Sequence, residues 1–289
     1  MTGPQPSLDD SYRQLLTELP PSLRQSARAL PGDIEFCRGA ISWDACVRLR
    51  VCRNLPLFAA EAMGRTRKTA SRFIVAHHRS LFYGVLADRL ADGQVTHTSE
   101  LRAIEKLFLA AWRKSLAEAA GRPVVVNRLV SQRLRDARLA QDIQRLAFRR
   151  HTISRRSYRK MVIMKLGWST LTSELFLATT AARSDQVAFS KTMQLLLLGL
   201  QCTDDAVDTS EDDRIFGSNI PKLLNTSPAT LAKAGTHLIS DASELARGGG
   251  FNDLARWLDR HASTPTLSDG DRFATELEGM ILAAQLRKS

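Results

Sequence analysis

The chain has 289 residues, of which 44% are hydrophobic and 25% charged, and its formal net charge is +11. Such a chain can bury a sizeable core, and its cationic surplus attracts anions. No apolar stretch approaches the roughly 18 to 20 residues of a membrane span, which excludes a transmembrane role. The four cysteines lack disulfide or zinc-site patterning, and residues 1–10 lack the apolar core of a secretory signal. We expect a cytoplasmic protein with a loose tail over 1–10 and one domain over 11–289.

Helical periodicity runs through nearly the whole chain, and no alternating strand of useful length is present. In chain order, helices are predicted over 8–18, 41–62, 66–92, 99–120, 128–147, 155–182, 186–208, 228–247, 251–262 and 269–287. The breaks, such as Pro31-Gly32 and residues 248–250, carry turn residues and none resembles an interdomain linker. The predicted class is therefore all-α, as a single helical bundle.

Basic residues are concentrated between Arg102 and Lys160, a segment that contains 16 lysines and arginines but only four acidic residues. Such a surplus suits a nucleic acid, an acidic membrane surface or a diphosphate substrate. Few aromatic residues lie among these arginines, and no nucleic-acid-binding motif is present. Nucleic acid is therefore not an expected partner.

An acidic pair, Asp88 and Asp92, closes the helix predicted over 66–92, just before Gly93. The two aspartates are four residues apart, so they share one helix face. Such a pair alone is typical of an ordinary helix end. A second acidic cluster on another helix changes this interpretation, because facing carboxylates on different helices can build a metal site in a bundle core.

The second cluster is the stretch from Gln201 to Asp208, which contains Asp204 and Asp205. On a helix, Asp204 and Asp208 lie at i and i+4, with Asp205 beside them and Gln201 one turn earlier. The leucine-rich run before these acids indicates a buried helix whose inner end carries them. Magnesium commonly takes one or two carboxylates, waters and substrate phosphates, so the stretch predicts a Mg²⁺-diphosphate site.

Direct positive charge is also needed to orient a diphosphate. Lys165 lies in an otherwise apolar helical stretch, where an unpaired lysine would be costly to bury, although its amine could also reach the surface. Arg159, Arg214 and Arg53 are weaker candidates for binding the diphosphate. No nucleophilic triad, phosphate-binding loop or dinucleotide fingerprint is present.

Lys165-Leu166-Gly167, followed by an apolar helix and the Gln201-x-x-Asp204-Asp205-x-x-Asp208 motif, resembles the second half of trans-isoprenyl diphosphate synthases. The resemblance covers roughly residues 155–225 and includes the glycine-to-proline segment 217–224. It implies an all-α isoprenoid (terpenoid) synthase bundle around a central apolar cavity. It also implies a site with three Mg²⁺ ions, held by Asp88, Asp92, Asp204, Asp205 and Asp208, and leaves a homodimer open.

The first half of the chain departs from the family pattern in two ways. Arg89 stands where the first acidic motif of the family has its second acid, and the basic motif with which the family binds the homoallylic diphosphate is not recognisable. Terpene synthases, squalene and phytoene synthases and the moenomycin-type prenyltransferase, all of which ionise an allylic diphosphate, fit these departures better. The expected function is a terpene-synthase-type conversion of geranyl, farnesyl or geranylgeranyl diphosphate. Prenyl transfer to another acceptor is the alternative, and a catalytically weakened subunit of a prenyl synthase is the rival from another class.

Overall fold

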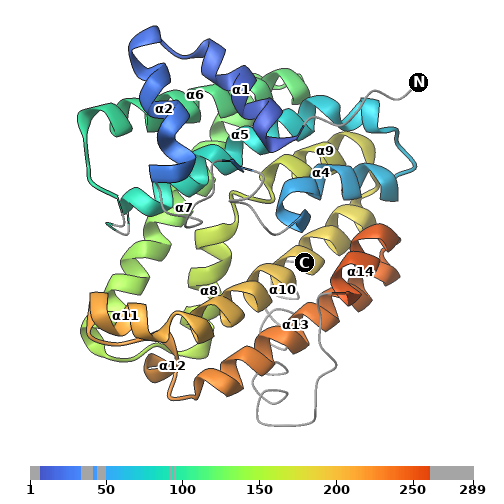
Figure 1. Ribbon diagram of the computed structural model, residues 1–289. Helices are drawn as coiled ribbons and strands as arrows, with labels where there is room; N and C mark the ends of the chain where they lie inside the picture. Colours follow the sequence, from blue (N-terminus) through green and yellow to red (C-terminus); the bar gives the residue numbers. More distant parts are fainter. Residues whose placement is uncertain (1–6, 34–41, 44–49, 92, 94, 261–289) are drawn as a thin grey trace. The chain divides into compact units, whose positions relative to one another are not determined.

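The computed structural model describes residues 7–33, 42–43, 50–91, 93 and 95–260, and their regular structure is helical without a strand (Figure 1). The predicted all-α class is confirmed. The helices are α1 (Leu8–Glu18), α2 (Pro21–Asp33), α4 (Arg50–Ala62), α5 (Arg67–Ala91), α6 (Ser99–Ala120), α7 (Pro123–Arg150), α8 (Arg155–Leu166), α9 (Leu171–Thr180), α10 (Arg183–Val207), α11 (Thr209–Phe216), α12 (Ile220–Leu223), α13 (Pro228–Gly248) and α14 (Asn252–Asp259).

Most predicted helices match these bounds within a few residues, and α1 and α6 match at both ends. Three helices were not predicted: α2, whose interior contains Pro31, and the short α11 and α12 after the acidic stretch. Residues 41 and 44–49 of one predicted helix, and all of 269–287, lie outside the described residues.

The prediction of one helix over 155–182 is wrong, because α8 ends at Leu166 and α9 begins at Leu171. Gly167 caps α8, and a Cβ at this position would lie 2.7 Å from the carbonyl oxygen of Ile163. Thr170 then precedes α9, and its hydroxyl donates to the Glu174 carboxylate at 2.6 Å. The chain therefore forms two separate helices over this region.

The described chain forms two compact units, each made of separate sequence segments. Unit 1 comprises residues 1–131 and 168–182, in which α5 packs against α1, α4, α6 and α9. Its core is an aromatic cluster of Tyr12, Trp43, Phe82 and Phe108, with ring centroids 4.8 to 6.5 Å apart for the contacting pairs. The boundary between the units falls within α7.

Unit 2 comprises residues 132–167 and 183–289, and the packing of α10 against α13 is its largest helix contact (Figure 1). The two helices meet at glycines: a Cβ at Gly235 would lie 2.7 Å from the Gly199 carbonyl oxygen and 2.6 Å from the Thr203 hydroxyl. Only glycines permit so close an approach of the two backbones. This crossing fixes α10 one turn before its acidic end.

Among the described residues, none of the helices combines the length and the hydropathy that crossing a bilayer requires.

Candidate functional site

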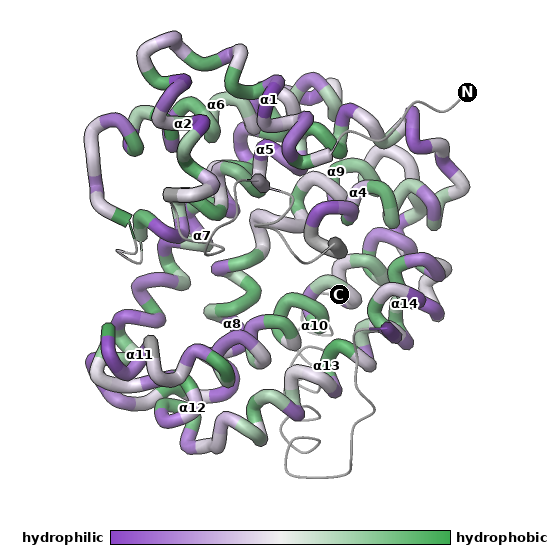
Figure 2. Tube along the Cα trace, viewed as in Figure 1, coloured by the Kyte–Doolittle hydropathy of each residue, from purple (hydrophilic) through white to green (hydrophobic). Residues whose placement is uncertain are grey.

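The acidic stretch lies at the end of α10, as its helical periodicity predicts. Residues 195–198 and Cys202 are buried, which matches the leucine-rich run coloured as hydrophobic in Figure 2. The backbone N–H of Asp208 donates to the Asp204 carbonyl oxygen at 3.0 Å, so the helical turn continues through Asp208. Asp204 and Asp208 are exposed, whereas Asp205 is buried.

Both carboxylate oxygens of Asp205 accept hydrogen bonds from neighbouring side chains. The phenol of Tyr158 on α8 donates to Oδ2 at 2.7 Å, and the amide of Gln201 donates to Oδ1 at 2.7 Å. The Gln201 amide also lies 3.3 Å from the Asp204 carboxylate, which links the buried and the exposed acid. The Tyr158 hydroxyl additionally approaches the Cys202 thiol at 3.7 Å. Asp205 is therefore held in a fixed orientation within unit 2.

The pKa of Asp205 is raised to about 7, mainly by burial and also by the neighbouring charge of Asp204. The hydrogen bonds from Tyr158 and Gln201 and the charge of Lys165 oppose this rise, because each stabilises the carboxylate. Burial also raises the pKa of Tyr158 well above its usual value, and that of the Cys202 thiol. The tyrosine and the free cysteine thus stay protonated near neutral pH, and Tyr158 acts as a hydrogen-bond donor.

Lys165 and Tyr158 lie seven residues apart on α8, which places them two turns apart on one face. This relationship explains why both side chains influence Asp205. Tyr158 was not among the predicted site residues, and its spacing from Lys165 is the sequence signal that could have identified it. Arg159, the residue after Tyr158, points about 100° away from it around the helix axis. It is half-buried, and burial and then the charge of Arg156 lower its pKa.

Among the residues that the structure describes, no three histidine, cysteine, aspartate or glutamate side chains are grouped closely enough to hold a metal ion. A closed protein cage for a metal is therefore not present there. Magnesium, however, is often bound by one or two carboxylates, with the other positions taken by waters and phosphate oxygens. Asp204 and Asp208, exposed on one helical turn, fit this partial role. The assignment of the aspartates as metal ligands stays a prediction.

Two predicted residues, Asp88 and Arg53, belong to unit 1. Asp88 and the adjacent Arg89 are half-buried in the last turn of α5, and Arg53 is half-buried on α4. Asp92 lies outside the described residues. The structure thus brings Gln201, Asp204, Asp205 and Lys165 together within unit 2, and the roles of the unit 1 residues stay predictions.

Arg214 is exposed in the last turn of α11, and no contact described for it links it to the acidic stretch. The segment after it has a structural role. Asp213 accepts hydrogen bonds from Asn219 at 2.9 Å and from Lys222 at 2.8 Å, which ties α11 to α12 across the Gly217 turn. The pKa of Asp213 is lowered mainly by the Lys222 hydrogen bond.

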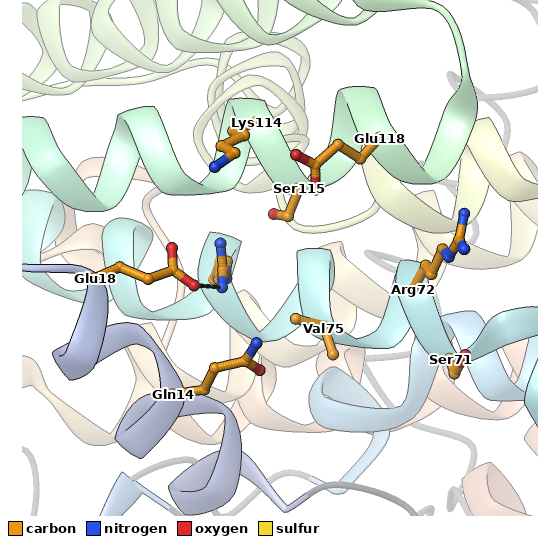
Figure 3. A pocket seen from close by; sticks show the side chains of 9 residues that line it. Gln14, Glu18, Ser71, Arg72, Val75, Lys114, Ser115 and Glu118 are labelled. Carbon is orange, nitrogen blue, oxygen red and sulfur yellow. Dashed lines mark hydrogen bonds and ion pairs between the residues drawn. The ribbon is translucent and has the colours of Figure 1, made fainter.

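A pocket of about 590 Å³ lies in unit 1 between α1, α5 and α6 (Figure 3). Arg79, which is buried, lines it and forms an ion pair with Glu18. Most of the other lining residues are polar or charged: Gln14, Ser71, Arg72, Lys114, Ser115 and Glu118. This lining does not suit a hydrocarbon chain, and none of the predicted site residues belongs to it.

In its fold, the chain is similar to the crystal structure of geranylgeranyl pyrophosphate synthetase from Pyrococcus horikoshii Ot3, with a TM-score of 0.56. The match covers 95% of this chain and 94% of that chain, at 16% sequence identity. No protein-family model matches the sequence, and no curated protein sequence matches it. The predicted isoprenoid synthase fold is confirmed by this full-length structural similarity.

Proposed function

We propose that this protein is a Mg²⁺-dependent isoprenoid synthase of the terpene-synthase type, which ionises an allylic prenyl diphosphate and converts the carbocation to a terpene. The observation that carries the proposal is the arrangement at the end of α10, in a chain with the fold of a prenyl diphosphate synthase. There, the exposed carboxylates of Asp204 and Asp208 flank the buried Asp205, which Tyr158 and Gln201 hold in place.

The residues at this site have distinct proposed roles. Asp204 and Asp208 would hold Mg²⁺ against the substrate diphosphate, and Asp205 would position the turn that carries them. Bound Mg²⁺ would supply Lewis-acid stabilisation of the charge that develops on the leaving diphosphate. Lys165 would add a positive charge that orients the same group. In the upstream cluster, Asp88 and Asp92 would serve as further metal ligands.

Prenyl transfer to a second isoprenoid or another small acceptor is the second candidate. It is favoured by the similarity to a geranylgeranyl pyrophosphate synthetase. Against simple chain elongation stands the lack of a recognisable basic motif for a second, homoallylic diphosphate. A third candidate, from another class, is a weakened subunit of a prenyl synthase, which Arg89 motivates because it replaces an acid of the family pattern.

The test is to incubate the purified protein with geranyl, farnesyl or geranylgeranyl diphosphate and Mg²⁺, each with and without isopentenyl diphosphate, followed by mass spectrometry of the organic extract. A terpene hydrocarbon or alcohol formed from one allylic diphosphate alone is the expected result. A product that forms only with isopentenyl diphosphate would identify a chain-elongating transferase instead.

Two further outcomes separate the remaining candidates. Slow release of diphosphate with little prenyl product would indicate a transferase whose acceptor was missing from the assay. Binding of a prenyl diphosphate without any turnover would favour the subunit role. The matched control is the Asp204→Asn variant, which keeps the shape of the side chain and removes its charge.

A further inference from the structure

The second half of α7 presents an arginine-rich surface that the proposed function does not use. Helix α7 carries hydrophilic and hydrophobic residues interspersed along its length in Figure 2. We define the arginine face as the exposed side chains between residues 135 and 150, all in unit 2. Its members are Arg135, Arg138, Leu139, Asp142, Arg145, Leu146, Arg149 and Arg150.

Helical geometry places these side chains on one side of α7. At about 100° per residue, they fall within an arc of about 140°. The opposite side is buried through Ala140, Ala147 and Phe148, and the Phe148 ring stacks on Phe216 with centroids 4.5 Å apart. The arginine face is therefore the outward side of a helix that unit 2 anchors from behind.

The charge of this face is strongly positive. Five arginines stand against one acid, Asp142, whose carboxylate lies 3.5 Å from the Arg145 guanidinium. Both side chains of this pair are exposed, at 60% and 68%, so the attraction between them is weak. Most of the positive charge of the arginine face therefore remains unneutralised. A second copy of the same face would be repelled, whereas an anionic surface would be attracted.

Two leucines identify the kind of anionic surface. Leu139 is 47% exposed and Leu146 45%, and they lie two turns apart between the arginines. Exposed leucines do not make a helix more soluble, so solubility alone does not explain their presence among the arginines. An anionic bilayer accommodates both residue types, because leucines enter the acyl boundary while arginine head groups reach the lipid phosphates. The face has no aromatic side chain for stacking on nucleic-acid bases.

We propose that the arginine face of α7 docks the protein on the surface of a membrane that contains anionic phospholipids. The contact is peripheral, with the helix lying along the interface. This inference does not depend on the proposed function, since it needs neither substrate nor catalysis. If the protein does make a lipophilic terpene, docking would place it at the phase into which that product partitions.

The test is co-sedimentation of the full chain with vesicles of phosphatidylcholine alone or mixed with phosphatidylglycerol, in EDTA and without substrate. Three double variants are compared with the wild type: Arg138→Gln with Arg145→Gln, Leu139→Ser with Leu146→Ser, and Arg183→Gln with Lys233→Gln. The last pair is the charge-matched control, because Arg183 and Lys233 are exposed on other helices of unit 2. Circular dichroism verifies that each variant keeps its helices.

We expect binding to the phosphatidylglycerol vesicles only. The arginine pair should weaken it by about 25-fold, at roughly fivefold for each arginine removed. The leucine pair should weaken it as well, and the control should bind nearly as the wild type does. An equal loss in the control would overturn the proposal in favour of a general charge effect. Unchanged binding by the leucine variant, together with tight, arginine-dependent binding of duplex DNA, would identify a nucleic-acid surface instead.

Discussion

The phenol of Tyr158 on α8 donates a 2.7 Å hydrogen bond to the Asp205 carboxylate on α10. Through this bond, the helix that carries Lys165 is joined to the helix that carries the acidic stretch, and both partners are buried. The bond therefore fixes the orientation of the turn on which Asp204 and Asp208 are exposed.

Removing this hydrogen bond should impair catalysis more than folding. For Tyr158→Phe, we expect roughly a tenfold fall in kcat, since about 1 to 1.5 kcal/mol of positioning is lost with one buried hydrogen bond. The KM for the prenyl diphosphate should change less, because Tyr158 acts through Asp205. Steady-state kinetics check this, with Tyr12→Phe as a control: Tyr12 is also buried, but its hydroxyl bonds a backbone carbonyl in unit 1. A KM effect alone would contradict the positioning role.

The buried Asp205 should make stability depend on pH. Its pKa rises from an ordinary value of 3.8 to about 7 on folding, so the folded state binds more protons between these values. The free energy of unfolding should therefore fall as pH rises from about 4 to about 7, and then level off. Asp205→Asn should remove this fall and be more stable than the wild type at pH 7, by up to roughly 4 kcal/mol. Urea unfolding of the metal-free wild type and Asp205→Asn across this pH range measures both free energies of unfolding. If the two free energies changed with pH in parallel, the prediction would be refuted.

Close packing of α10 on α13 should tolerate no side chain at the crossing. A Cβ at Gly235 would meet Thr203 and Gly199 at 2.6 and 2.7 Å, so Gly235→Ala should destabilise the protein by about 1 to 3 kcal/mol. Gly248→Ala on the same helix is the matched control, because nothing lies within 4 Å of its added Cβ. The control should be neutral or stabilising by about 0.4 to 1 kcal/mol. Similar melting temperatures for the two variants would show that α13 can shift.

The upstream cluster gives a separate prediction. If Asp88 is a metal ligand, Asp88→Ala should lose product formation, whereas Arg89→Asp should keep or raise it, because an acid at position 89 restores the family pattern. Product yield is measured at saturating and at limiting Mg²⁺. Full activity of Asp88→Ala would mean that this pair is only the end of α5.

Local sequence patterns predicted much of the fold and part of the candidate site. The leucine run and the i, i+4 spacing of Asp204 and Asp208 predicted the acidic end of α10, because both depend only on helix periodicity. The same periodicity concealed the break at Gly167, where the chain turns although apolar residues continue on both sides. Helix periodicity also implied equal roles for the three aspartates, whereas packing against Tyr158 buries Asp205 and leaves Asp204 and Asp208 exposed. Such a difference between adjacent residues arises from contacts distant in sequence.

Release of inorganic diphosphate from farnesyl diphosphate in Mg²⁺ tests the claim that the carboxylates at the end of α10 ionise an allylic diphosphate. The wild type should release diphosphate together with a terpene product. Asp204→Asn and Asp208→Asn, each verified as folded by circular dichroism, should reduce the rate at least 100-fold, since each removes charge that the transition state needs. Wild-type rates in both variants at saturating Mg²⁺ would contradict the claim.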